Sequence, residues 1–206
     1  MKNRSFHFIF CSLLILCLDG CFSAGAKNTV VYTPRASPPI SSEGPAVSWQ
    51  IRIQTPHASD FLDSTRIAVR RSNNTLQVFE GARWSDNVPD LLQSTLGQTF
   101  NDSGKITAAV GLDNNTVSDA LLLLDVRQFE AVYTDDDHTA SAVISVQAKI
   151  QSLKNNRIIA SKHFLVNVPA ANKKIPQVMT AFDTALQQVS QDILNWTLTT
   201  DVPERK

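Results

Sequence analysis

Apolar residues recur every three or four positions between 88 and 100, a spacing that places them on one face of a helix. The apolar set is Val88, Leu91, Leu92, Leu96 and Phe100, and the set expected on the opposite face is Asp90, Gln93, Ser94 and Gln98. Asn87 is expected to accept a backbone N–H as the N-cap, and Pro89 suits the first turn, where its missing donor would have no partner. The pattern predicts an amphipathic helix that starts at Asn87, stops at the signal Asn101-Asp102-Ser103-Gly104 and covers a sheet.

The same spacing returns near the C-terminus over about six turns at 3.6 residues per turn. Its apolar positions are Ile175, Val178, Met179, Phe182, Leu186, Val189, Ile193 and Trp196. Pro176 lies near the first turn, where proline is tolerated. The chain order is therefore strands, helix, strands, helix.

Alternation of apolar and polar residues predicts the strands, because successive side chains of a strand point to opposite faces. The predicted strands lie at 49–54, 66–71, 75–79, 106–111, 121–133, 142–150 and 157–168, with a candidate leading strand at 30–32. Ser72-Asn73-Asn74 is typical of a tight hairpin turn, and a change of parity at Arg127-Gln128 predicts a bulge. The close spacing of the last three strands predicts an antiparallel meander.

These elements predict an α+β fold, in which a mostly antiparallel sheet carries both amphipathic helices on one face. At 206 residues and 43% hydrophobic, the chain fits one domain. We predict a signal peptide at 1–20, an anchor and a linker rich in Pro and Ser at 21–47, the domain at 48–200 and a polar tail at 201–206. The prolines of the linker favour extended conformations, so the linker is expected to hold the domain well off a membrane.

One large aromatic stands between the predicted hairpin and the first helix. Trp84, flanked by Arg83 and Asp86, is expected in a tight loop. As an exposed residue it would be a partner-binding anchor, because Trp and Arg are over-represented among interface hot spots. In the alternative that we favour, Trp84 closes the end of the core, Arg83 pairs with a nearby carboxylate, and Asp86 helps to fix the start of the helix.

The first 21 residues have the pattern of a secretory signal. Lys2 and Arg4 precede an apolar run over 8–18, which is shorter than a membrane span of about 20 residues but fits a signal-peptide core of about 7–15. All three cysteines fall in this region, and Leu18-Asp19-Gly20-Cys21 resembles a bacterial lipobox. Cys21 is therefore the candidate lipid-attachment site, where several acyl chains would anchor the protein stably in a membrane. An ordinary secretory peptide is the alternative.

Charge and motifs exclude several classes of function. The 19 basic residues balance the 19 acidic ones, so we expect no clustered basic surface for nucleic acid. His57, His138 and His163 are scattered singly, without metal-ligand spacing. Asp135-Asp136-Asp137-His138 is favoured as a solvated turn over a cation site, because it lacks the spaced ligands of a calcium loop. We predict no cofactor, no metal and no enzymatic activity.

Three segments together resemble a known protein family. They are Ile51-Arg52-Ile53 followed by a proline, Arg66-Ile67-Ala68-Val69-Arg70, and Ala82-Arg83-Trp84-Ser85-Asp86 with Val88-Pro89 and the leucines of the first helix. On these residues, between Tyr32 and Trp196, the chain is similar to the ABC-type transport auxiliary lipoprotein family. This family includes the outer-membrane lipoprotein of the paraquat-inducible lipid transport system.

The resemblance implies a non-enzymatic lipoprotein that faces the periplasm from the outer membrane. Its partners would be an ABC transporter and an MCE-domain protein that move lipids or other apolar molecules between the two membranes, and the rings formed by some relatives imply a possible homo-oligomer. Phe22, next to the anchor, is not the aspartate associated with inner-membrane retention, which also favours the outer membrane. The alternatives are a structural envelope lipoprotein and an envelope hydrolase that uses the carboxylates of Asp86 or of 135–137.

Overall fold

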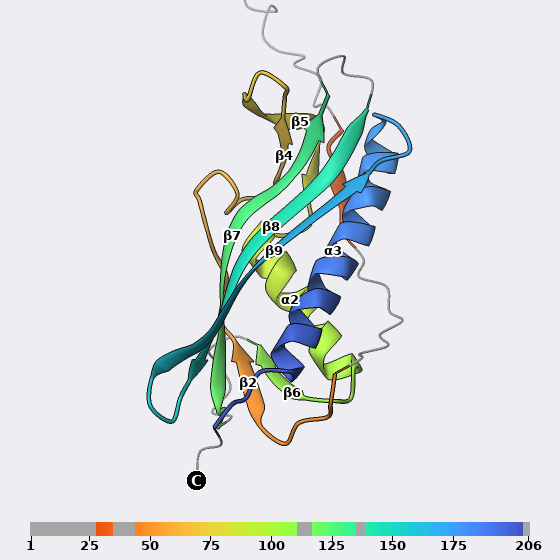
Figure 1. Cartoon of the computed structure of the whole chain (residues 1–206). Coiled ribbons are helices and arrows are strands. Elements are labelled where there is room, and N and C mark those ends of the chain that lie inside the picture. The colour runs from red at the N-terminus through yellow and green to blue at the C-terminus, as the bar shows by residue number, and fades with distance from the viewer. Residues whose placement is uncertain (1–27, 35–43, 111–116, 135–138, 204–206) are drawn as a thin grey trace, which may run out of the picture.

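The computed structural model describes residues 28–34, 44–110, 117–134 and 139–203 (Figure 1). The predicted signal peptide, Cys21, the aspartates at 135–137 and His138 lie outside these ranges. Within them, no helix combines the length and the apolarity that crossing a membrane requires.

The sheet is built around one long strand, β7 (Ala120–Tyr133). Along one edge, β7 pairs antiparallel with β8 (Ala140–Ser152), which in turn pairs antiparallel with β9 (Arg157–Pro169). The predicted meander is therefore confirmed. The predicted bulge is confirmed as well, because the β7–β8 register shifts between Val126 and Gln128.

The other edge of β7 carries three short strands in succession, all parallel to it. They are β2 (Gln50–Ile53), β3 (His57–Ala58) and β4 (Arg66–Arg70). β6 (Thr107–Val110) lies beside β2, and β5 (Leu76–Trp84) lies beside β4. β1 (Val30–Tyr32) pairs parallel with β5, which confirms the predicted leading strand.

The nine-stranded sheet is mixed, so the prediction of a mostly antiparallel sheet is wrong. Among the described strands, antiparallel pairing is confined to β4–β5, β7–β8 and β8–β9. Alternation reports which face of a strand is buried, but it does not report the direction of the neighbouring strand. Three strands that follow one another in one direction along β7 therefore leave no trace in the local pattern.

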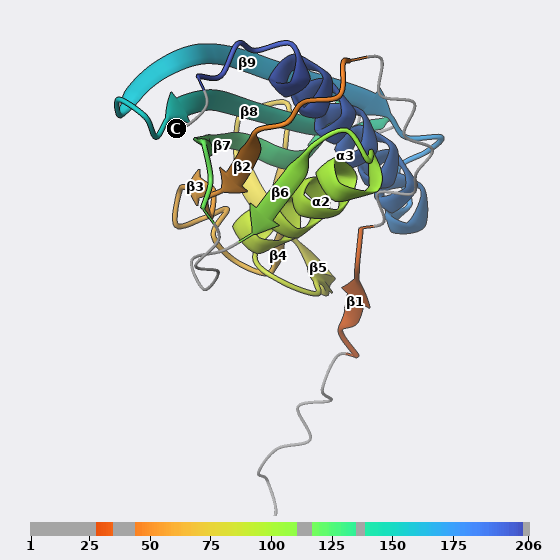
Figure 2. The ribbon, with the colours of Figure 1, turned by 90° about the horizontal axis from the view of Figure 1, so that it is seen from below.

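The two helices agree with the predicted ranges. α3 (Ile175–Leu198) contacts β8 and β9, α2 (Val88–Asp102) contacts β2 and β6, and the helices contact each other. In Figure 2, α2 lies beneath the curved band of β7, β8 and β9, and α3 overlaps the right-hand part of that band. After α2, Gly104 adopts a left-handed φ of 63° and donates its N–H to the carbonyl oxygen of Asn101 at 3.1 Å. The predicted glycine stop is confirmed.

Two details of α2 differ from the prediction. Asn87 occupies the N-cap position but makes no capping hydrogen bond; its Nδ2 donates instead to Oδ1 of Asp63 at 3.2 Å. Gln93, expected on the solvent face, is only 7% exposed and donates from Nε2 to the carbonyl oxygen of Ile53 at 2.9 Å. This bond to β2 satisfies a polar group inside the core, so the residue's polarity was a poor guide to its position.

The stretch around Trp84 also differs from the prediction. The sequence predicts that the strand ends at Phe79 and that Trp84 lies in the loop that follows. In the structure, β5 instead continues to Trp84. Gly81 adopts a left-handed φ of 70°, and the β4–β5 register shifts between Arg66 and Ala68. An irregularity that only glycine adopts easily interrupts the alternation here and hides the strand.

An ion pair with a buried carboxylate joins β4 to β7. Arg70 donates from Nε and Nη2 to the two carboxylate oxygens of Glu130, at 2.6 and 2.9 Å. Gln128 donates to the same carboxylate at 2.9 Å, and only 2% of the Glu130 side chain is exposed. The hydrogen bond to Glu130 raises the pKa of the Arg70 guanidinium above its ordinary value. Bidentate geometry of this kind fixes the position of one strand against the other.

Two parts of the predicted linker lie on the folded body. Beside β1, Ser85 donates its N–H to the carbonyl oxygen of Tyr32 at 2.8 Å. Farther along the predicted linker, the carbonyl oxygen of Gly44 accepts a hydrogen bond from Nζ of Lys105. A Cβ atom on Gly44 would stand 2.7 Å from Cβ of Leu198, so the chain passes close against the end of α3.

Candidate functional site

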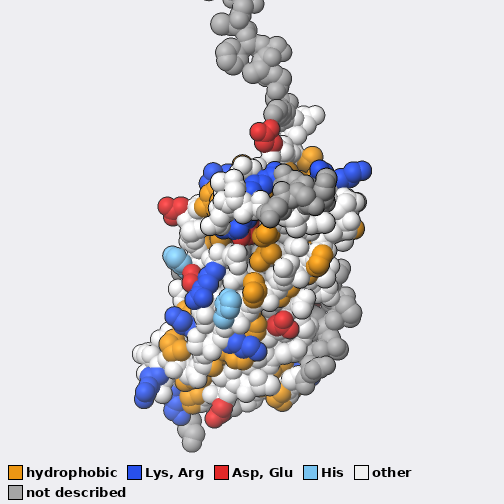
Figure 3. Space-filling model, turned by 45° about the horizontal axis from the view of Figure 1, so that its top comes forward, with side chains coloured by type: hydrophobic (Ala, Val, Ile, Leu, Met, Phe, Trp, Pro, Cys, Tyr) orange, Lys and Arg blue, Asp and Glu red, His pale blue; other side chains and the backbone are white. Residues whose placement is uncertain are grey.

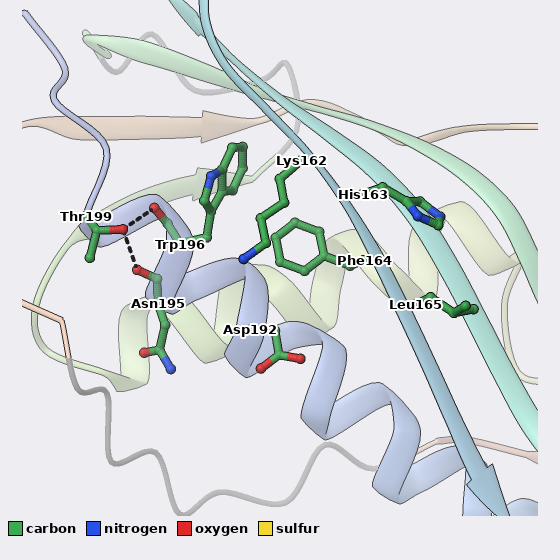
Figure 4. Close-up of a pocket in the computed structure, with 8 residues that line it drawn as sticks. All are labelled: Lys162, His163, Phe164, Leu165, Asp192, Asn195, Trp196 and Thr199. Atoms are coloured by element: carbon green, nitrogen blue, oxygen red, sulfur yellow. Dashed lines mark hydrogen bonds between the residues drawn. The ribbon is translucent and has the colours of Figure 1, made fainter.

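A groove of about 540 Å³ runs between β9 and the C-terminal half of α3 (Figure 4). Its lining residues are Lys162, His163, Phe164, Leu165, Asp192, Asn195, Trp196 and Thr199. Alternation along β9 points Lys162 and Phe164 toward the helix, while the side chains of His163 and Leu165 point away from it. The helical residues share one side of α3 because they are three or four positions apart.

Two aromatic rings form the apolar part of the groove. The rings of Phe164 and Trp196 lie edge to face, with centroids 5.6 Å apart and planes inclined by 68°. Nζ of Lys162 stands 5.1 Å from the centroid of the Phe164 ring, within the range of a cation–π interaction. Contact between these two rings thus joins β9 to α3, and the ammonium group of Lys162 lies over Phe164. We call the surface formed by Phe164 and Trp196 the ring shelf.

The polar part of the groove comes from the last turns of α3. Partial burial raises the pKa of Asp192, and the positive charge of Lys162 lowers it by a smaller amount. Asn195 accepts a hydrogen bond at Oδ1 from Nε2 of Gln191 at 3.2 Å. Thr199 donates its hydroxyl to the carbonyl oxygens of Asn195 and Trp196 (Figure 4), which leaves its oxygen able to accept from a ligand.

A second, smaller hollow of about 230 Å³ lies beside the N-terminal half of the same helix. Its lining residues are Val168, Pro169, Ala171, Gln177, Thr180, Ala181 and Thr184. The side-chain oxygen of Gln177 is buried and has no hydrogen-bond partner among the residues that the structure describes. A buried acceptor without a donor is unfavourable, so this oxygen favours a ligand that brings an N–H or O–H group.

His163, one of the three isolated histidines, faces the opposite side of β9. Its Nε2 lies 2.8 Å from Oγ of Ser145 on β8. Among the described residues, no three His, Cys, Asp or Glu side chains gather in a way that could hold a metal ion. In the view of Figure 3, basic and acidic side chains are scattered among neutral and hydrophobic ones.

Trp84 is buried in the hydrophobic core. It is 1% exposed, and its ring meets those of Phe129 and Phe182 edge to face at 5.6 and 5.1 Å. Phe129 and Phe182 stack on each other at 5.3 Å. This cluster joins β5, β7 and α3.

The other residues singled out from the sequence do not join Trp84 in a site. Arg83 and Asp86 are exposed, and neither makes an ion pair with another residue in the described ranges, so the expected carboxylate partner of Arg83 is not found there. Cys21 lies outside those ranges.

Sequence reasoning missed the groove. Trp196 was recognised only as the last apolar position of a helix, and Lys162 and Phe164 only as parts of a strand. The available signal was an aromatic at the end of a helical stripe, where the apolar face gives way to Asn195 and Thr199. That signal indicates a groove only when it is known that β9 lies beside the end of α3.

A family model described as the ABC-type transport auxiliary lipoprotein component matches residues 32–194. A solved structure from Xanthomonas campestris, attributed to the family DUF330, is 34% identical and has a TM-score of 0.77, covering 82% of this chain and 95% of that one. A second solved structure, of an uncharacterised protein, is 14% identical with a TM-score of 0.65, covering 82% and 99% of the two chains, and it indicates a shared fold.

A curated relative gives a third comparison. An uncharacterised protein of Bradyrhizobium diazoefficiens is 23% identical over 189 residues, which cover 88% of this chain and 50% of that protein. The chain therefore spans about half the length of this relative.

Proposed function

Because the chain belongs to the ABC-type transport auxiliary lipoprotein family, we propose that it is the membrane-anchored auxiliary component of an ABC transport system in a bacterial envelope. In this proposal it faces the periplasm from the outer membrane, is held there by acyl chains on Cys21, and catalyses no reaction. Its partners are an ABC transporter and an MCE-domain protein that pass lipids or other apolar molecules between the two membranes.

The family match is the observation that carries this proposal. It runs from the end of β1 to the last turns of α3, so it covers the central sheet and both helices instead of one short motif. The groove beside β9 supports a binding role, because it offers a ring shelf, two opposite charges and uncharged polar groups on one open surface. Such mixed surfaces suit protein recognition.

The position of β1 limits how far the body reaches from the proposed anchor. Residues 22–29 separate Cys21 from Val30. Fully extended, these eight residues span at most about 30 Å. β1 is paired with β5, so the later part of the predicted linker adds nothing to this reach. We therefore infer that the body works close to its own membrane and that its partners bridge the remaining periplasm.

Crosslinking in the native envelope tests the proposal. A tagged full-length protein should capture an ABC transporter subunit and an MCE-domain subunit, identified by mass spectrometry. A Cys21→Ser variant, which lacks the lipid-bearing thiol, is the matched control and should capture much less of both. If neither subunit is captured and deletion leaves envelope permeability unchanged, a structural envelope lipoprotein becomes the better explanation.

The anchor has a separate test. Mass spectrometry of the mature protein should find an acylated N-terminal Cys21, and density-gradient fractionation should recover it with the outer membrane. An unmodified mature terminus at another residue would overturn the anchoring, and recovery with the inner membrane would overturn only the location.

A further inference from the structure

β9 is the outermost strand of the meander, and its outer edge has no paired strand in the part of the chain that the structure describes. It is 13 residues long, which corresponds to about 43 Å at 3.3 Å per residue. An edge of this length presents a row of backbone donors and acceptors to any extended chain that approaches it. Leu165, 60% exposed, adds apolar surface to the same strand.

The two hollows described above lie along one seam between this strand and α3. The larger one lies beside residues 162–165, and the smaller one lies beside Val168 and Pro169, farther along β9. Each is bordered by a different half of the same helix. The free edge and the two hollows therefore follow one line, as expected for a site that accepts an extended segment.

The charge of the seam indicates what kind of segment it suits. Among the described residues that line the two hollows, only Lys162, His163 and Asp192 are ionisable, and Lys162 and Asp192 have opposite charges. The remaining lining residues are apolar side chains, amides and hydroxyls. A nearly neutral lining complements an uncharged segment, because a charged side chain would lose its hydration there without gaining a partner.

Two features favour a polypeptide as the occupant over a lipid chain. The buried oxygen of Gln177 needs a donor, which a peptide N–H supplies and a hydrocarbon does not. The charges of Lys162 and Asp192 interrupt the apolar lining that an acyl chain would require. A peptide that pairs with β9 can instead alternate its side chains between the hollows and the solvent.

We propose that the seam between β9 and α3 binds an extended, uncharged segment of a partner protein, which adds to the sheet as a strand beside β9. An apolar side chain of the segment occupies the shelf of Phe164 and Trp196, and a backbone N–H or an amide of the segment bonds to Gln177. The identity of the partner as a subunit of the transport system rests on the proposed function. The seam itself depends only on the residues of β9 and α3 that form it.

The test uses overlapping, fluorescently labelled peptides of about 12 residues that tile the periplasmic segments of the transporter and MCE-domain subunits. Binding to the full-length protein in detergent is measured by anisotropy. At least one uncharged peptide should bind, and Thr184→Trp, which fills the smaller hollow from an exposed position, should weaken it at least tenfold. Ser94→Trp, an equally exposed substitution on α2, is the matched control and should leave the affinity unchanged.

The backbone of the bound peptide distinguishes strand addition from other contacts. N-methylation of alternate amides should abolish binding in one register and leave it intact in the other, because only every second N–H of a strand faces its neighbour. Hydrogen exchange should slow in β9 when the peptide binds. Equal effects in both registers, or unchanged exchange in β9, would overturn the proposal.

The remaining outcomes separate this inference from the proposed function. If the transporter is captured in the envelope but no peptide binds, the adaptor role stands and the seam proposal fails. If no peptide binds and Thr184→Trp abolishes self-association in sedimentation, the occupant is a second copy of this chain, which also overturns the proposal. Peptide binding without transporter capture would support the seam and count against the proposed function.

Discussion

Among single residues, Trp84 has the largest side chain in the fully buried core. Trp84→Ala would remove its contacts with Phe129 and Phe182 and leave a cavity where three elements meet. We expect the free energy of unfolding to fall by about 3–5 kcal/mol, measured by urea denaturation. Trp84→Phe, which keeps a ring, should cost less. A stably folded Trp84→Ala protein that fails to capture partners would instead favour the partner-binding interpretation.

Asp192 gives a prediction that depends on pH. Its pKa in the folded state lies above the ordinary value of 3.8, so the folded protein holds this proton more tightly than the unfolded chain does. Stability contributed by this group is therefore present at low pH and is lost as the pH rises through the raised pKa. Asp192→Asn should remove that loss and raise stability at pH 7 by at most about 0.5 kcal/mol, because water screens this partly exposed group.

Urea midpoints of the wild type and of Asp192→Asn, compared between pH 7 and pH 4, measure this effect. The gain should shrink as the pH falls. A loss of stability at pH 7 would mean that attraction to Lys162 outweighs the cost of burying the carboxylate.

At the scale of elements, the Arg70–Glu130 pair connects β4 and β7, which are joined in parallel and are distant in the chain. Glu130→Gln would leave the guanidinium of Arg70 without its charged partner, although 29% of the Arg70 side chain still reaches water. We expect a loss of about 2–3 kcal/mol in the free energy of unfolding. The double variant Arg70→Met, Glu130→Leu should recover most of it, and equal losses in both variants would contradict this account.

Most elements could be predicted from periodicity, because both helices and the long strands bury one face of a regular pattern. α2 begins directly after Asn87 with Pro89 in its first turn, α3 begins at Ile175 with Pro176 in its first turn, and the bulge in β7 shows as a change of parity. β5 could not be followed to Trp84, because Gly81 breaks its alternation. The parallel strand pairs along β7 bring together residues about 60 positions apart, such as Arg70 and Glu130. A pattern within one strand does not reveal such a pairing.

The candidate site was beyond sequence reasoning for the same reason. The groove exists because β9 and the end of α3 lie together, and Phe164 and Trp196 are separated along the chain by most of the last helix. Trp84 was conspicuous in the sequence, but its large side chain serves the core. Residue type alone does not separate a buried anchor of the fold from a ring at a binding surface.

In the molecule as a whole, one continuous hydrophobic core includes residues from β2 and β6, from β4 and β5, and from both helices. We therefore expect one cooperative unfolding transition. The fluorescence of a single tryptophan reports unfolding of the region around it. Three variants that each retain one of Trp49, Trp84 and Trp196, with phenylalanine at the other two positions, therefore test whether the regions unfold together. Their urea midpoints should each agree with the one that far-UV circular dichroism gives for the same variant. A separate, earlier transition at Trp49 would show that the β2–β6 region unfolds alone.

The pairing of β1 with β5 has a mechanical consequence under the proposed anchoring at Cys21. Any pull between the membrane and the body enters the fold at Val30 and passes directly to β5, whose last residue is Trp84. Because β1 runs parallel to β5, a pull along the strand loads its few hydrogen bonds in shear, together instead of one after another. In single-molecule stretching from the N-terminus, Val31→Pro should release β1 at a lower force than in the wild type and lengthen the tether before the core yields. An unchanged force would mean that the tension is carried elsewhere, and that the short strand is only a surface attachment.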